Sequence, residues 1–209
     1  MDEPFKALKN KIQKNHSEFD ISRIQKAYEL SKSVHEGQKR KSGEPYIHHP
    51  VAVADIIYNI GGDESMICAA LLHDTIEEAG DTEVVRKAIR EGFGIDVRFL
   101  VEALSKDGNI EDKISQQADY FARVEEALKI DIAIFFLKMA DLIHNMKTIS
   151  SLPPKRQENW VRELKHMYMP LMSRNFHKIS LHHHVPYMNL MNELESVIEA
   201  HSCEQEQAK

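Results

Sequence analysis

Apolar residues recur at helical spacing along almost the whole of this 209-residue chain. In the segment that follows Asp20, for example, Ile24, Tyr28 and His35 fall on one face of a helix. The sequence has no pair of alternating, β-branched runs joined by a hairpin turn. We therefore expect an all-α fold of about nine to ten helices.

Local signals set the expected bounds of several helices. Aspartate caps are expected for helices that begin after Asp20 and after Asp63, and Asp81 or Thr82 is expected to start another. Pro50 is expected to open a helix at its first turn. We expect one helix over 64–78, a break near 92–94 and a helix over 155–176.

The composition indicates a single globular domain. Apolar residues make up 42% of the chain and charged residues 29%, which is the balance of a protein with one packed core. Glycine and proline are too few and too scattered to form a linker. We expect one domain over residues 1–209, with a motif-bearing core at about 21–171, C-terminal helices within 155–201 and a polar tail at 202–209.

The net charge of −6 argues against a surface that attracts nucleic acid polymers or anionic membranes. The longest apolar run, residues 132–137, is far too short to span a bilayer, and the acidic start of the chain lacks the core of a signal peptide. Cys68 and Cys203 are predicted to be free thiols, which suits a reducing compartment. We expect a cytoplasmic protein with no nucleic acid polymer and no membrane as a partner.

Several side chains that can bind a metal lie in otherwise apolar helical segments. Asp141 directly follows the segment 135–140, which is apolar except for Lys138, and a carboxylate there costs several kcal/mol unless it is paired or metal-bound. Two imidazoles with two carboxylates suit a first-row divalent ion. The alternative for a single inward histidine is a hydrogen-bonded core residue. The candidate metal ligands are His35, His73, Asp74 and Asp141.

Glu77 and Glu78 lie one helical turn beyond His73 and Asp74. From that position a carboxylate can orient a water molecule near the metal or take its proton. The alternative is a solvated helix end. We therefore predict that Glu77 and Glu78 are the catalytic acid–base residues.

Two polar segments are candidates for the wall of a pocket near the metal ligands. The basic loop that follows the helix of His35 offers a guanidinium fork and an ammonium group to phosphate. The helix of Asp141 offers an ammonium, an amide and a hydroxyl close to one face. The alternatives are an ordinary surface loop and a threonine that bonds to its own backbone. The candidate residues of this polar pocket are Arg40, Lys41, Lys138, Asn145 and Thr148.

The remaining conspicuous residues are predicted to be structural. For His48 and His49 we expect packing at a helix entry, with one of them facing the pocket as the alternative. The run 182–184 of adjacent histidines is predicted to be an exposed loop, because consecutive side chains point in different directions. Trp160 is predicted to pack on the core or between helices.

Three sequence blocks, taken together and in this order, resemble the hydrolase domain of the RelA/SpoT homologue family. The blocks are HEGQKRKSGEPYIHHP at 35–50, AALLHDTIEE at 69–78 and KMADLIHNMKT at 138–148. The resemblance implies an all-α HD-superfamily fold and one Mn²⁺. It also implies removal of the 3′-pyrophosphate from guanosine tetra- or pentaphosphate, which leaves GDP or GTP. The small-molecule partner is therefore expected to be a nucleotide polyphosphate.

The resemblance also implies roles for individual residues. Its metal ligands match His35, His73, Asp74 and Asp141. Its water-handling pair matches Glu77 and Glu78, and its nucleotide contacts match Arg40, Lys41, Ser42, Asn145 and Thr148. Glu78 stands where the family usually has Asp, and Leu142 stands where it usually has Arg.

The chain is expected to be a stand-alone small alarmone hydrolase without a synthetase region. Alternatives within the enzymes are hydrolysis of the adenosine counterparts of these alarmones and removal of the 2′-phosphate from NADPH. A non-catalytic nucleotide-binding HD module is the alternative from another class; the complete set of candidate ligands and acids argues against it.

Overall fold

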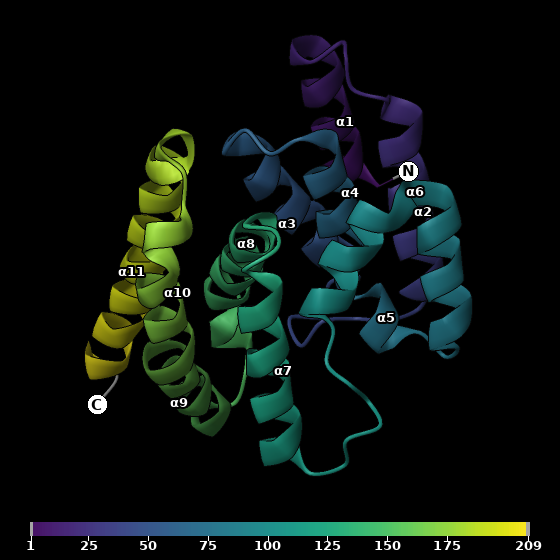
Figure 1. The fold of residues 1–209 in the computed structure, drawn as a ribbon. Coiled ribbons are helices and arrows are strands. Elements are labelled where there is room, and N and C mark those ends of the chain that lie inside the picture. Colours follow the sequence, from purple (N-terminus) through teal and green to yellow (C-terminus); the bar gives the residue numbers. More distant parts are fainter. Residues whose placement is uncertain (1, 208–209) are drawn as a thin grey trace.

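A computed structural model of the chain describes residues 2–207. Within these residues it contains α-helices, short 3₁₀ and π turns and no β-strand, which confirms the predicted all-α fold. Figure 1 shows the arrangement of the helices. Their bounds are α1 Glu3–Asn15, α2 Ile21–Val34, α3 His48–Asn59, α4 Glu64–Leu72, α5 Thr75–Glu78, α6 Thr82–Leu104, α7 Lys113–Ala127, α8 Ala133–Lys147, α9 Pro154–Glu163, α10 Met169–Asn175 and α11 His184–Gln207.

The central helix of the fold is α8. It packs against α3, α4 and α6 on one side and against α11 on the other, as Figure 1 also shows. Eleven of its fifteen residues are buried, so this helix is covered on nearly every face. A nearly all-round apolar helix is stable only inside the protein, and this places Asp141 in the core.

Aspartate side chains cap the helices that lead into the core. The Asp20 side chain accepts hydrogen bonds from the backbone N–H groups of the first turn of α2. Asp63 does the same for α4, and Asp81 for α6. The predicted caps at Asp20 and Asp63 are confirmed, and of the two candidates Asp81 and Thr82 it is Asp81 that caps the helix. The predicted break near Gly94 is also present, as a kink inside α6 at which Gly94 has a φ of 81°.

The predicted helix over 64–78 is wrong in one respect, because it breaks at His73 and Asp74 into α4 and α5. The Thr75 hydroxyl donates a hydrogen bond to the backbone oxygen of Leu72, and His73 Nδ1 bonds to the backbone oxygen of Ala70. Side chains that bond to nearby carbonyl groups compete with the helical ladder. The break turns His73 and Asp74 into helix-end residues.

The C-terminal helices differ from the prediction in extent. The predicted helix over 155–176 contains a π turn at Leu164–Tyr168 between α9 and α10. The last helix, α11, continues to Gln207, so the backbone of 202–207 is helical and not a frayed tail. Residues 208–209 of the predicted tail, and the side chain of Cys203, lie outside the described residues. Cys68 is a buried free thiol, as predicted.

None of the helices within residues 2–207 combines the length with the apolar character that a bilayer span requires.

Candidate metal centre

Two histidines and an aspartate from three helices converge in the core. His49 lies in the first turn of α3, His73 is the residue after α4, and Asp141 lies in the second half of α8. All three are buried, and one ligand atom from each lies within 4.8 Å of the others. His49 Nε2 is 3.2 Å from His73 Nε2 and 3.2 Å from Asp141 Oδ1. This cluster can bind a metal ion.

Asp74 extends the cluster to a fourth side chain. Its Oδ1 atom is 3.2 Å from His73 Nε2, and its Oδ2 atom is 3.5 Å from His49 Nε2. The set therefore offers two imidazole nitrogens and two carboxylates around one point. Mixed nitrogen and oxygen donors of this kind suit first-row divalent ions better than Ca²⁺ or Mg²⁺. The residues present fit the ion that the family resemblance implies.

Each imidazole has a hydrogen-bond partner on the side away from the cluster. His73 Nδ1 lies 2.8 Å from the backbone oxygen of Ala70, an acceptor that requires the proton to be on Nδ1. His49 Nδ1 lies 2.8 Å from Nδ1 of His144. Both ligand rings thus turn Nε2 toward Asp74 and Asp141. Outer partners of this kind fix the orientation of metal-binding histidines.

Each carboxylate is held in the same manner. Asp141 Oδ1 accepts a hydrogen bond from Asn145 Nδ2 at 2.6 Å, and Asp141 Oδ2 accepts one from Lys138 Nζ at 2.9 Å. Asp74 Oδ2 accepts a hydrogen bond from the Tyr46 hydroxyl at 2.8 Å. The carboxylates are thereby oriented before any ion arrives.

The electrostatic field of the cluster favours a positive charge. Burial alone would lower the pKa of His73, but Asp74 and Asp141 outweigh it and raise that pKa to about 9. Burial alone would raise the pKa of Asp141, but Lys138 and the histidine hydrogen bonds hold it well below its usual range. The same field that keeps a proton on His73 attracts a divalent cation.

His35, the first predicted ligand, is not part of this group. It is buried as expected, but it lies at the C-terminal end of α2, with Nδ1 2.9 Å from Gln38 Oε1. Its ring stacks on Tyr46 at 4.5 Å between centroids. Its Nε2 atom is buried and has no hydrogen-bond partner among the described residues. Burial lowers the pKa of His35, so the ring is neutral.

His49 takes the position that was expected for His35. Helix α3 begins at His48, before the predicted start at Pro50, and this places His49 on the buried stripe with Val53 and Ile57. That spacing of i, i+4 and i+8 is readable in the sequence. A core histidine and a ligand histidine produce the same local pattern, so the spacing alone predicts packing for His49. Only the convergence of α3 with α4 and α8 distinguishes them.

The predicted acid pair lies beside the cluster. The Glu77 side chain lines the same cavity, and its Oε1 atom accepts a hydrogen bond from the backbone N–H of Lys106 at 2.7 Å. Glu78 does not line this cavity; partial burial, Asp74 and Glu77 raise its pKa. Glu77 is therefore held at the cavity by this hydrogen bond, while the environment of Glu78 disfavours its ionised form. Their catalytic roles stay predictions.

Two cavities adjoin at the site. One of about 230 Å³ lies at the cluster, and one of about 250 Å³ lies under the basic loop. Both are lined by Tyr46, Asn145 and Trp160, so Trp160, predicted to pack, forms part of a cavity wall. The cavity at the cluster contains Lys138 and Asn145 from the candidate residues of the polar pocket, and the second contains Arg40, Lys41, Asn145 and Thr148.

The basic loop is tied to α8. Arg40 Nη2 donates hydrogen bonds to Asn145 Oδ1 at 2.7 Å and to Thr148 Oγ1 at 3.2 Å. Within the loop, the backbone N–H of Arg40 bonds to the backbone oxygen of Glu44 at 2.9 Å, and Gly43 adopts a φ of 90°. Ser42 is exposed in this turn and lines neither cavity. The structure therefore brings Arg40 and Lys41, but not Ser42, to the site.

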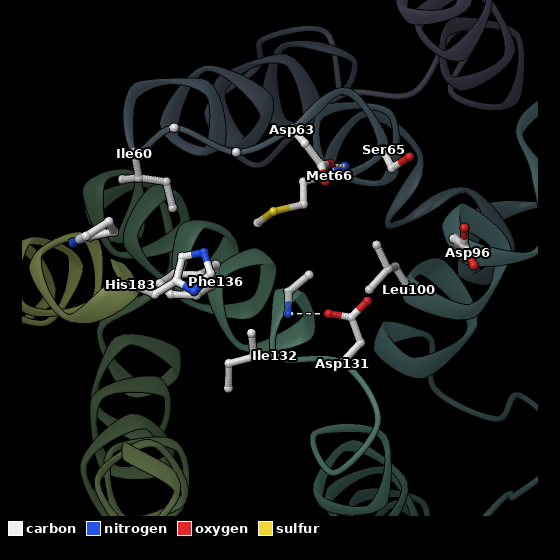
Figure 2. A pocket seen from close by; sticks show the side chains of 14 residues that line it. Ile60, Asp63, Ser65, Met66, Asp96, Leu100, Asp131, Ile132, Phe136 and His183 are labelled. Carbon is white, nitrogen blue, oxygen red and sulfur yellow. Dashed lines mark hydrogen bonds between the residues drawn. The ribbon is translucent and has the colours of Figure 1, made fainter. Parts of the chain in front are cut away.

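A third cavity of about 310 Å³ lies at the opposite ends of the same helices. It is lined by residues that include Ile60 after α3, Asp63 before α4 and Phe136 in the first turns of α8. Figure 2 shows these side chains, with Asp131 accepting a hydrogen bond at the start of α8. None of the predicted site residues lines it.

Comparison with known proteins identifies the family of the chain. A family model described as HD domain matches residues 27–175. The chain belongs to the HD domain family. The bifunctional (p)ppGpp synthase/hydrolase SpoT of Escherichia coli K12 is 40% identical over 181 residues, which is 86% of this chain and 25% of that protein. A guanosine-3′,5′-bis(diphosphate) 3′-pyrophosphohydrolase of Vibrio cholerae is 35% identical over 195 residues, or 92% of this chain and 26% of that protein.

These identities confirm the resemblance to the RelA/SpoT homologues. The chain spans about a quarter of the length of the curated relatives it matches. A solved structure described as a metazoan ortholog of SpoT that hydrolyzes ppGpp has a TM-score of 0.68 and 19% identity. The match covers 86% of this chain and 95% of that one, which supports the same fold.

Proposed function

We propose that this chain is a metal-dependent hydrolase that removes the 3′-pyrophosphate from guanosine tetra- or pentaphosphate. The observation that carries the proposal is the cluster of His49, His73 and Asp141 at the floor of a cavity that adjoins a basic loop. The names of the relatives point to the same substrate. We further propose that the described residues form a single domain and that the protein acts in the cytoplasm.

The ion is proposed to be one Mn²⁺, held by His49, His73, Asp74 and Asp141. The donor set supports a first-row divalent ion of this type. Such an ion supplies Lewis-acid chemistry, because it lowers the pKa of water toward ~7 and withdraws charge from phosphate oxygens. This proposal replaces His35 with His49 in the expected ligand set.

Glu77 is proposed to orient the attacking water and to take its proton. Its carboxylate lines the cavity, and the bond from the Lys106 N–H holds one oxygen and leaves the other free. Partial burial, together with the charges of Asp74 and Glu77, raises the pKa of Glu78, so it suits a role in holding a proton.

Arg40 and Lys41 are proposed to bind the nucleotide. Both line the cavity next to the cluster, and Arg40 is oriented by Asn145 and Thr148. A guanidinium group fits phosphate or stacks on a base, while an ammonium group acts as a point charge. Lys138 donates a hydrogen bond to Asp141. Its proposed effect on the phosphates is therefore exerted mainly through the position and charge of that carboxylate.

The proposed reaction breaks the bond between phosphorus and the ribose 3′ oxygen. The water oxygen bonds to the phosphorus nearest the cluster and its proton passes to Glu77, while the bond from phosphorus to the 3′ oxygen breaks. The leaving 3′ oxygen then takes up the proton that Glu77 received and becomes a hydroxyl. Pyrophosphate departs in one piece, and GDP or GTP remains. In ¹⁸O-water, the label is therefore expected in pyrophosphate and not in the nucleoside.

The deciding test is a product analysis with guanosine and adenosine 3′-pyrophosphates and with NADPH, each with Mn²⁺ and with a chelator. We expect intact pyrophosphate from the guanosine compounds, only with Mn²⁺. Glu77→Gln should lose this activity, and the exposed Glu91→Gln should keep it. Orthophosphate from NADPH as the main product, or ¹⁸O in the nucleoside hydroxyl, would overturn the proposal.

A further inference from the structure

His144 lies on the outer side of the cluster, next to the ligand His49. We propose that His144 is a positioning residue, whose neutral ring accepts the Nδ1 proton of His49 and so holds the His49 Nε2 lone pair toward the metal site. The inference rests on the metal centre of the proposed function. It does not depend on which nucleotide is hydrolysed.

The geometry restricts the protons between the two rings. The two Nδ1 atoms are 2.8 Å apart, a hydrogen-bond distance that requires one of them to donate and the other to accept. If His144 donated, the proton of a neutral His49 ring would sit on Nε2. It would then point at His73 Nε2 and Asp141 Oδ1, both 3.2 Å away. That tautomer has no lone pair for a metal, so the ligand form of His49 requires His144 to accept.

The two ligand histidines differ in the group that accepts the proton on Nδ1. His73 donates its Nδ1 proton to the backbone oxygen of Ala70, which can only accept and which no substitution removes. His49 Nδ1 has the side chain of His144 as its partner. An imidazole can donate or accept, so the tautomer of His49 depends on the state of a replaceable residue. This makes His144 a point at which the metal site can be weakened selectively.

The position of His144 on α8 brings its ring to that of His49, with 4.9 Å between the ring centroids. His144 follows Asp141 by three residues, and Asn145 follows it by four. One helix therefore carries a ligand, the amide that orients this ligand, and the acceptor for a second ligand from α3.

The first test measures binding of Mn²⁺ alone by electron paramagnetic resonance. His144→Leu removes the acceptor at similar volume, and we expect the dissociation constant to rise about 10- to 100-fold, the usual effect of losing an outer partner. His144→Asn places Oδ1 where the imidazole has Nδ1, and we expect it to restore binding to within about threefold of the parent. The exposed His166→Leu is the matched control and should bind as the parent does.

The second test needs no substitution. Side-chain ¹⁵N NMR of the histidines, on protein loaded with diamagnetic Zn²⁺, reports which ring nitrogen carries the proton. We expect the proton of His49 on Nδ1 and that of His144 on Nε2. A proton on Nδ1 of His144 would overturn the inference, even if the leucine variant does not fold.

Failure of this inference is distinguishable from failure of the proposed function. Equal Mn²⁺ affinity of the leucine variant and the parent, with hydrolysis intact, would overturn the role of His144 alone. Loss of affinity in the leucine variant, with rescue by asparagine, supports that role even if the nucleotide substrate proves to be another one.

Discussion

The ion pair between Lys138 and Asp141 offers the most direct test of the charge balance in the site. Lys138 Nζ lies 2.9 Å from Asp141 Oδ2, with both side chains nearly buried, and the ammonium group also lies over the rings of Tyr120 and Tyr168. Lys138→Met removes the charge and keeps most of the apolar stem. We expect a less stable apoprotein, because the Asp141 carboxylate loses its main compensating charge.

The burial of the Lys138–Asp141 pair sets the expected loss in the free energy of unfolding. Breaking a buried pair costs about 3–5 kcal/mol, because the remaining charge is uncompensated. Asn145 and the two histidines still contact Asp141, so we expect the lower end, about 3 kcal/mol. For a protein of this size that is a fall in Tm of roughly 6–12 °C. The exposed pair of Lys129 with Glu126 supplies the control Lys129→Met, for which we expect less than about 1 kcal/mol.

Both bound metal and pH should change the loss of stability caused by Lys138→Met. Mn²⁺ bound at the cluster supplies a positive charge next to Asp141, so saturating Mn²⁺ should narrow the Tm difference between variant and parent. The folded-state pKa of Asp141 is lowered, so its contribution to stability is present above the unfolded value near ~4 and is lost as the pH falls through the folded value. Thermal unfolding from pH 7 down to about pH 3 with chelator, and at pH 7 with Mn²⁺, measures these effects. A loss as small as that of the control, or an equal loss with and without metal, would refute the reasoning.

Three further variants separate catalysis, binding and folding. Glu77→Gln removes a proton acceptor, and we expect kcat to fall ~10²–10⁴-fold while Mn²⁺ affinity is kept; a change confined to KM would contradict an acid–base role. Lys41→Ala removes a charge worth roughly 1.5–3 kcal/mol at a phosphate, which is about 10- to 150-fold in KM, and equal kinetics at every salt concentration would mark the loop as ordinary surface. Asp20→Ala removes the N-cap of α2, and we expect about 1 kcal/mol less stability with no effect on Mn²⁺ affinity.

The fold was readable from the sequence wherever its cause is local. Periodicity located the helices, and the caps at Asp20 and Asp63 were correct because a cap depends on residues two or three positions away. The break at His73 was missed. Its causes are a hydroxyl and an imidazole that bond to backbone oxygens three residues earlier, and the sequence pattern of an uninterrupted apolar helix does not reveal this competition.

Part of the site could be predicted from the sequence for a related reason. Asp141 stood out because a carboxylate within an apolar run needs compensation, and the structure supplies it from Lys138 and Asn145 on the same helix. His49 gave no such signal, since histidines occur in cores without binding metals. Its partner His144 is 95 residues away in the chain, and no local pattern links the two.

Lys138 and Asn145 compensate the buried charge of Asp141 from within α8. This leads to a last prediction, on whether the protein needs the metal ion in order to fold. Small zinc-dependent domains unfold without their metal, because the ion itself brings the ligands together. Here α3, α4 and α8 pack through a buried apolar core, and Lys138 and Asn145 already satisfy Asp141. We therefore expect chelator-treated protein to keep its far-UV circular dichroism and a cooperative thermal transition, while Mn²⁺ raises the Tm by an amount that grows with its concentration. Loss of helical signal on metal removal, at a temperature well below the Tm, would mean that the ion and not the packing of these helices assembles the site.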